Sequence, residues 1–120
     1  MAEYKQYITQ VLENGNVMIS EDVIAAIITD TVAEIDGMGG LAVKPVSEFA
    51  DLIGMNWGKG MKIAIAEDNS VGIDCNVLVK YGCSVIEVAK NAQQAITAAV
   101  EGTAGVKVSY VNVNVCGVAR

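Results

Sequence analysis

Cys83 is the side chain best suited to chemistry in this chain of 120 residues. It directly precedes Ser84, which begins a helix-like pattern, and the free amide groups at a helix N-terminus favour a reactive thiolate. The chain contains no histidine, so the most common general base and metal ligand of proteins is missing. Two interpretations follow: a reactive or redox-sensing thiol, and an ordinary small residue in a turn. The second is favoured, because free cysteine usually behaves as a small apolar residue.

A glycine-rich stretch at residues 54–60 is the second candidate. Its glycines and Lys59 follow an order like that of a phosphate-binding loop, but the spacing is one residue short. Gly60 also stands where a Ser or Thr would hold magnesium. Because the stretch leads into a strand-like pattern, no helix N-terminus would receive a phosphate. We interpret it as a loop, and Trp57 within it is the centre of an alternative ligand-binding hypothesis.

The acids Asp36 and Glu101 occupy matching places in an internal repeat. Residues 35–43 and 100–108 both read apolar-acid-Gly-x-x-Gly-apolar-x-Val. A catalytic carboxylate pair would need burial or proximity, and a nucleic-acid-binding Gly-x-x-Gly loop would join two helices. Each repeat instead follows a helical pattern and precedes a strand-like one, so we interpret both as helix stops. The sequence thus predicts no catalytic residue, no cofactor and no metal ligand.

The same repeat outlines the predicted fold. Each copy ends a helix-period segment begun by a serine, at residues 20–36 and 84–101, and the second begins with the capping box Ser84-x-x-Glu87. Strict alternation predicts a hairpin at residues 61–79. Short strands are expected at residues 17–19 and 41–43. We therefore predict a single α+β domain of order β-α-β / β-β-α-β, with a mainly antiparallel sheet packed against two main helices.

A short N-terminal amphipathic helix is predicted in residues 1–16, ahead of a domain spanning residues 17–120. Apolar residues recur there at helix spacing. With two aromatic residues further along the chain, they form the predicted surface for a protein partner. These residues are Tyr4, Tyr7, Ile8, Val11, Leu12, Phe49 and Trp57. The alternative is that they cover an otherwise open face of the sheet.

The C-terminal segment, residues 106–118, is predicted as a long strand with little charge. Its apolar alternation changes parity near Tyr110, which indicates a bulge or burial on both faces. If the strand lies at the sheet edge, its backbone offers a template for a second copy, through Val111, Val113 and Val115. The alternative is a monomer in which residues 17–19 or 41–43 cover this edge.

Composition limits the class of partner. The net charge is −6 and the eight basic residues are dispersed, which argues against binding to nucleic acid or to anionic lipid. No apolar run approaches the ~20 residues of a membrane span, and no secretory signal is evident. Three cysteines without Cys-x-x-Cys spacing fit reduced thiols. A cytoplasmic protein without direct membrane insertion is expected.

Residues 17–118 resemble the alkaline shock protein family, also called the Gls-type envelope stress response family, of Gram-positive and related bacteria. The residues that carry the resemblance are Val17-Met18-Ile19-Ser20-Glu21-Asp22, Gly37-Met38-Gly39-Gly40-Leu41, Trp57-Gly58-Lys59-Gly60-Met61, Val79-Lys80-Tyr81-Gly82 and Val111-Asn112-Val113-Asn114-Val115. The resemblance implies a small cytoplasmic α/β protein linked to cell-envelope stress. Some members gather at the inner face of the membrane through a separate membrane-anchored partner. It carries over no catalytic residues.

The function expected from these observations is that of a non-enzymatic envelope stress response protein, acting as a binding or scaffolding module. It would work through self-association as a homo-oligomer and through a membrane-anchored protein partner. The alternative is a small enzyme or ligand-binding protein that uses Cys83 or the Trp57 loop.

Overall fold

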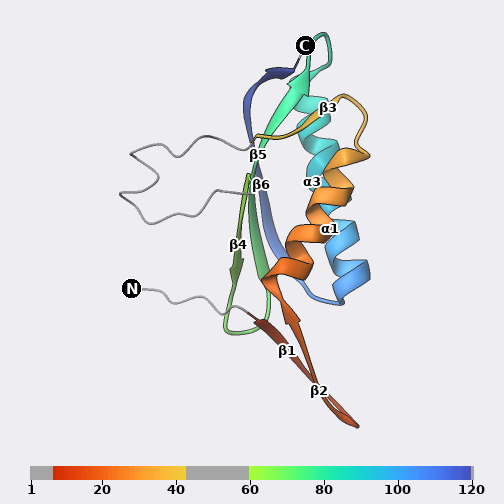
Figure 1. Ribbon diagram of the computed structural model, residues 1–120, viewed down its shortest axis with the longest axis vertical. Helices are drawn as coiled ribbons and strands as arrows, with labels where there is room; N and C mark the ends of the chain where they lie inside the picture. The colour runs from red at the N-terminus through yellow and green to blue at the C-terminus, as the bar shows by residue number, and fades with distance from the viewer. Residues whose placement is uncertain (1–6, 43–59, 120) are drawn as a thin grey trace, which may run out of the picture.

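A computed structural model describes residues 7–42 and 60–119 of the chain (Figure 1). Tyr4, Phe49, Trp57 and the glycine-rich stretch before Gly60 lie outside the described residues. The elements are, in chain order, β1 (Tyr7–Leu12), β2 (Gly15–Ser20), α1 (Glu21–Ala33), β3 (Met38–Leu41), β4 (Met61–Ile65), β5 (Val71–Lys80), α3 (Val85–Ala104) and β6 (Val108–Ala119). This order confirms the predicted α+β class, with one strand added at the N-terminus.

Strand β5 is the centre of a four-stranded sheet. Strands β4 and β3 pair antiparallel with its first and second halves on one side, and β6 pairs parallel with nearly its whole length on the other. The predicted hairpin is the β4–β5 pair, in which Ile63 lies opposite Ile73. Of the two strands proposed to cover β6, β2 pairs with β1 and β3 pairs with β5. Neither covers the outer edge of β6.

Both helices lie on the same face of the sheet (Figure 1). Helix α1 buries Ile24, Ile28 and Val32, and helix α3 buries Ala92, Ile96 and others along one stripe. Full burial of an isoleucine or valine contributes ~1.5–3 kcal/mol, so this stripe stabilises the fold strongly. The inner face of β5 meets it with Val71, Ile73, Cys75, Val77 and Val79, all at most 1% exposed.

Three details of the helices differ from expectation. Val85, an apolar residue in the first turn of α3 that its spacing from Val88 predicts to face inward, is 42% exposed. Helix α3 continues through Gly102 and ends at Gly105, whose left-handed φ of 69° closes the helix. Gly102 is thus a helical residue rather than the stop, because the apolar stripe extends to the buried Ala104 and favours one more turn. Ser20 stands at the N-cap of α1 without a side-chain capping bond, whereas Ser84 Oγ accepts from the N–H of Glu87 at 3.4 Å.

The N-terminal helix prediction is wrong for Tyr7–Leu12, which forms strand β1 of a hairpin with β2. Ile8 lies opposite Ile19 and Leu12 opposite Gly15. Over so few residues, an apolar pattern fits both helix and strand periods. Asn14-Gly15 between two apolar segments was the signal for a hairpin, and Gly15 adopts φ 136° there. The hairpin projects from the body at the lower end of Figure 1.

Strand β6 contains the expected irregularity. Its register against β5 shifts between Val108 and Tyr110, and again between Val115 and Gly117. Each shift inserts one residue, Ser109 and Cys116, as a bulge does. The first shift explains the change in apolar parity near Tyr110 and turns Val111 onto the helix-covered face, where it is buried.

Candidate functional site

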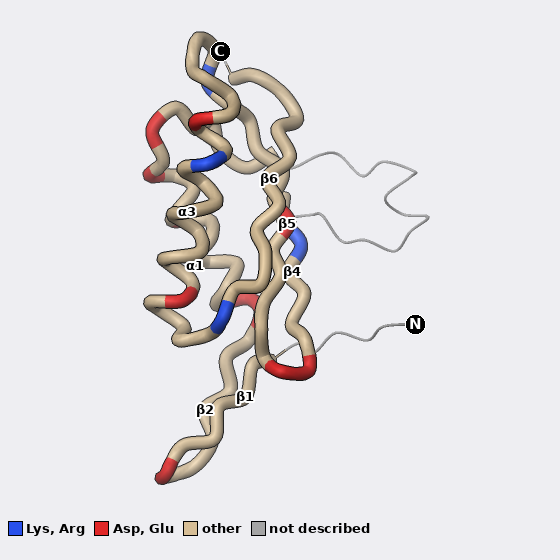
Figure 2. The backbone as a smooth tube through the Cα atoms, turned by 180° about the vertical axis from the view of Figure 1, so that it is seen from behind, with Lys and Arg blue, Asp and Glu red and all other residues tan. Residues whose placement is uncertain are grey.

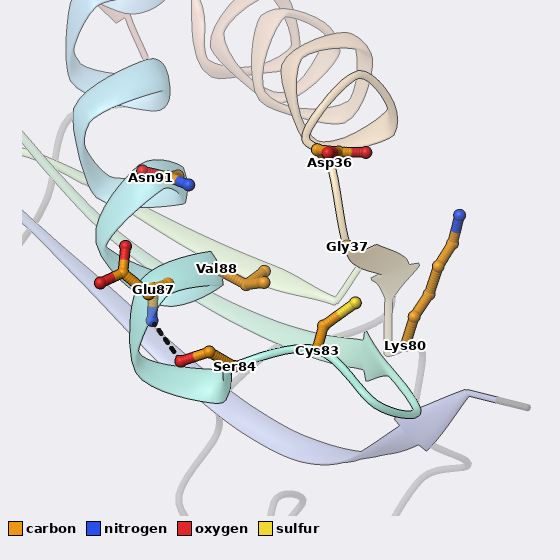
Figure 3. Close-up of a pocket in the computed structure, with 8 residues that line it drawn as sticks. All are labelled: Asp36, Gly37, Lys80, Cys83, Ser84, Glu87, Val88 and Asn91. Carbon is orange, nitrogen blue, oxygen red and sulfur yellow. Dashed lines mark hydrogen bonds between the residues drawn. The ribbon is translucent and has the colours of Figure 1, made fainter.

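A cavity of about 390 Å³ lies at the end of the molecule opposite the hairpin, where α3 begins (Figure 3). Three segments build it: the turn after α1, the end of β5, and the first turns of α3. Its lining residues are Asp36, Gly37, Lys80, Cys83, Ser84, Glu87, Val88 and Asn91. The cavity therefore contains Cys83, the strongest candidate for chemistry in the sequence.

Close packing around Gly37 shapes one wall of this cavity. Gly37 has φ +82°, and a Cβ built on it would lie 2.9 Å from Val88 Cγ2 and 3.2 Å from Cys83 Sγ. The N–H of Lys80 donates to the Gly37 carbonyl at 2.9 Å, and the N–H of Cys83 donates to the Lys80 carbonyl at 3.2 Å. A glycine is required here both for the left-handed turn and for the room that it leaves to the thiol.

The chemical repertoire of the cavity is limited. Cys83 is solvent-exposed, and the lining carries both charge signs, one lysine (Lys80) and two carboxylates (Asp36 and Glu87). Such a set could contact a small polar molecule. No group of His, Cys, Asp and Glu suited to a metal ion occurs in the described part of the chain.

The two other cysteines lie elsewhere. Cys75 is completely buried in β5, and this burial raises the pKa of its thiol to about 12. Cys116 is exposed on β6 and donates weakly to the carbonyl of Asn114 at 3.6 Å. Cys75 is therefore a core residue, as its place on the apolar side of the strand predicts.

The two acids of the repeat do not meet. Asp36 lines the cavity, whereas Glu101 lies near the other end of α3, where its Oε2 accepts from the backbone N–H of Val108 at 3.1 Å. Glu101 thus satisfies a backbone donor at the start of β6, a structural role.

The predicted partner surface is only partly described. Tyr7, Val11 and Leu12 are 46%, 79% and 53% exposed, whereas Ile8 is fully buried at the hairpin base. Sequence reasoning missed the contribution of β2, whose Val17 and Met18 are 43% and 61% exposed. Alternation within the β1–β2 hairpin would have placed them beside the residues of β1.

The predicted self-association edge is an open edge in the described structure. β6 pairs only with β5 there. Val111 is buried and Val113 and Val115 are half-buried against the core, so their side chains face the helices. Gln93 of α3 donates its Nε2 to the carbonyl of Val111 at 3.1 Å, which gives one acceptor of this edge strand a partner.

The sheet face away from the helices is polar over β5 and β6. The Asn112 amide donates to Asp74 Oδ1 at 2.9 Å, and the Asn114 amide donates to Asn76 Oδ1 at 3.2 Å. These side-chain hydrogen bonds between neighbouring strands explain why asparagines alternate with valines in β6.

Comparison with known proteins assigns this fold to a family. The model of the alkaline shock protein 23 family, described as having a cell envelope-related function, matches residues 9–120. The chain belongs to this family. The expected resemblance is thereby confirmed, and the match extends across most of the β1–β2 hairpin.

Relatives from two organisms support the assignment to the alkaline shock protein 23 family. The uncharacterized protein YloU of Bacillus subtilis is 31% identical over 109 residues, covering 87% of this chain and 88% of the relative. The uncharacterized protein Spy1614 of Streptococcus pyogenes serotype M6 is 30% identical over 106 residues, covering 86% and 87%. The uncharacterized protein YqhY of Bacillus subtilis is 29% identical over 108 residues, covering 87% and 77%.

No solved structure matches this chain. Among the described residues, no helix has the length and apolar character to cross a membrane.

Proposed function

We propose that the protein is a non-enzymatic module of the bacterial cell-envelope stress response, which binds or scaffolds other proteins from the cytoplasmic side of the membrane. It does so by associating with copies of itself and with a membrane-anchored protein partner. The family's cell envelope-related function supports the setting. The observation that carries the scaffolding role is the outer edge of β6, with which no other described strand pairs.

Strand β6 has twelve residues, and only Lys107 and the C-terminal Arg120 bring positive charge near it in sequence. Natural edge strands usually avoid pairing through charge, proline or short length. β6 contains no proline or charged residue, although its two bulges and the Gln93 contact limit its regular part. The regular stretch between the two bulges, which contains Val113 and Val115, is therefore the best place for pairing with a second copy.

Light scattering on the purified protein tests whether two copies associate through the edge of β6. Val113 packs partly against the core, so a lysine there would also affect folding; the exposed Cys116 is the better site. We expect Cys116→Lys to weaken association. Cys116→Ser is the matched control, because serine is close to cysteine in size and introduces no charge. A species of 12.6 kDa that is unchanged with concentration in the unmodified protein would contradict self-association through any surface.

Cell fractionation tests the membrane-anchored partner. We expect the protein to sediment with membranes in its native host and to appear in the soluble fraction when expressed alone in an unrelated bacterium. Equal distribution in the two hosts would contradict a dedicated partner.

A second candidate function rests on the cavity that contains Cys83, with Lys80, Asp36 and Glu87 in its lining. In this alternative the protein is a small enzyme or ligand-binding protein. A Cys83 thiol that reacts with iodoacetamide much faster than free cysteine near neutral pH, or a bound small molecule in native mass spectrometry, would favour it. Reaction at the rate of free cysteine would favour the scaffold.

A further inference from the structure

The β1–β2 hairpin has one apolar face that points away from the core. Side chains alternate along a strand, and residues directly opposite each other in an antiparallel pair share a face. One face contains the buried Ile8 and its partner Ile19, which packs against the core. The other, called the outer face, contains Tyr7, Val11 and Met18, which are 46%, 79% and 61% exposed. An exposed apolar patch of this kind is typical of a protein interface.

The base of the hairpin is fixed to the body of the molecule. The Gln10 amide donates to the carbonyls of Ala104 and Gly105 at 3.4 and 3.2 Å. Asn69, from the β4–β5 turn, donates its amide to the Thr9 carbonyl at 3.0 Å. The outer face is therefore held in place before a partner arrives, which lowers the entropy cost of binding.

Acidic side chains flank the outer face at both of its ends. Glu13 is the one charged residue in the range 7–20, and it is the red segment at the tip of the hairpin in Figure 2. Glu21 and Asp22 follow β2 directly, at the start of α1, and both are exposed. The apolar part of β1 between these acids spans roughly 13 Å. The surface thus has an apolar middle and carboxylates at its two ends.

Charge is distributed unevenly along the described chain. Residues 60–119 contain five acids and four lysines, whereas residues 7–42 contain six acids and no Lys or Arg. The six are Glu13, Glu21, Asp22, Asp30, Glu34 and Asp36. Helix stability does not explain all of them, because Asp30 and Glu34 lie at the C-terminal end of α1, where the helix dipole favours cations. The hairpin and α1 together therefore present an uncompensated negative potential.

The neighbouring β4–β5 turn differs, because the chain partly compensates its charge. Hydrogen bonds from Ser70, and less strongly the charge of Lys107, lower the pKa of Asp68. The hairpin and α1 contain no lysine or arginine of their own. At this end of the molecule, the side that lacks a base is therefore the one formed by the hairpin and the start of α1.

We propose that the outer face of the hairpin binds a cationic amphipathic protein segment, in which apolar residues lie between Lys or Arg residues. The apolar residues of the segment cover Val11 and Met18, and its flanking bases meet Glu13 at the tip and Glu21 at the base. Charge disfavours the other candidates, since a second copy has a net charge of −6 and anionic lipid is also negative.

This inference rests on the proposed function and names the surface that its membrane-anchored partner uses. Cytoplasmic residues next to a membrane span are enriched in Lys and Arg. Such a segment combines the positive charge that the acids require with the apolar residues of the adjoining span. The segment that binds the hairpin is therefore the cytoplasmic stretch beside the partner's membrane anchor.

Fluorescence anisotropy tests the surface with a labelled synthetic peptide in which leucines are flanked on both sides by lysines. We expect saturable binding that weakens with salt, and binding at least about tenfold weaker for the same peptide with Glu in place of Lys. Met18→Ser and Val11→Ser should each weaken binding by about threefold to tenfold, and Glu13→Gln by about threefold at low salt. The controls at the opposite end, Ile86→Ser and Glu87→Gln, should bind like the unmodified protein; glutamine also suits that capping position.

Two results with purified protein would overturn the proposal. One is equal affinity for the lysine and glutamate peptides, or hairpin variants that bind like the controls. The other is binding of the unmodified protein to phosphatidylglycerol vesicles that is lost in Met18→Ser, because the hairpin then recognises a lipid surface rather than a protein segment.

Cell fractionation separates this proposal from the existence of the partner. We expect Met18→Ser and Val11→Ser to leave the membrane fraction of the native host and Ile86→Ser to remain in it. If the hairpin variants sediment with membranes like the unmodified protein, the partner stands and the hairpin is not its site. If the unmodified protein itself stays in the soluble fraction, the membrane-anchored partner of the proposed function is contradicted, and this assignment is overturned with it.

Discussion

The side-chain amide of Gln10 donates to the carbonyl oxygen of Gly105 at 3.2 Å. The last carbonyls of an α-helix have no partner within the helix, and here a residue 95 positions away in the chain satisfies one of them. Gln10 thus joins the β1–β2 hairpin to the C-terminal end of α3 and so to the core.

Replacing Gln10 tests this connection. We expect Gln10→Ala to lower the free energy of unfolding by about 1 kcal/mol, the usual net contribution of such hydrogen bonds. Amide exchange in β1 and β2 should accelerate more than exchange in β5. Urea denaturation and hydrogen exchange measure both effects. Gln94→Ala, on the exposed side of α3, is the control and should change stability by less than about 0.5 kcal/mol.

Replacing either of two glycines near the end of helix α3 by alanine should change the stability of the protein, in opposite directions at the two positions. Gly105 has φ +69°, so Gly105→Ala should destabilise the protein by about 1 kcal/mol. Gly102 is helical, and a Cβ built on it meets nothing within 4 Å. Gly102→Ala should therefore stabilise by up to about 1 kcal/mol. Thermal unfolding of the two variants checks the signs; destabilisation by Gly102→Ala would argue that the helix ends there.

The Tyr110 ring lies over Gly72, where a built Cβ would overlap its ring carbons. Gly72→Ala forces the ring or the β5–β6 pair to move, at a cost of roughly 1–3 kcal/mol. Removing the ring should relieve this clash, so Gly72→Ala should cost much less in a Tyr110→Ala background. A double-mutant cycle by urea denaturation measures the difference, and strictly additive effects would contradict the contact.

Cys75 should make stability fall at alkaline pH. Burial raises its pKa in the folded state from 9.0 to about 12, so the folded protein holds this proton more tightly than the unfolded chain. The contribution of the protonated thiol to the free energy of unfolding is complete below pH 9. It is lost as the pH rises towards 12, at up to about 1.4 kcal/mol per pH unit. Urea denaturation between pH 8 and 10.5 should show this slope, reduced in Cys75→Val.

Labelling of the three thiols provides an independent check on burial. Iodoacetamide at pH 8 should modify Cys83 and Cys116, which are exposed, and leave Cys75 unmodified until the protein unfolds. Peptide mass spectrometry identifies the sites. Rapid labelling of Cys75 in the native protein would contradict the packing of β5.

Local sequence signals were sufficient for most elements of the core. Alternation from Met61 to Val79 predicted the central hairpin, and Ser84 with Glu87 predicted the start of α3, because period and capping act between near neighbours. These local signals gave a wrong prediction where the same residues fit two kinds of secondary structure. Residues 7–12 fit a helix and a strand equally, and pairing with β2 decides in favour of the strand, since Ile8 is then buried against Ile19 and the core.

The candidate site depended more on tertiary structure. The sequence alone determined that Cys83 precedes a helix and that histidine is absent, and its motifs identified the family. Only the fold could place Gly37, Lys80 and Cys83 around one cavity, because the turn after α1 and the end of β5 meet through backbone hydrogen bonds between distant residues. Likewise, the sequence alone shows that the β1–β2 hairpin and the β5–α3 connection contain large apolar residues. Their position at opposite ends follows from the directions of β5 and α3, which only long-range pairing and packing decide.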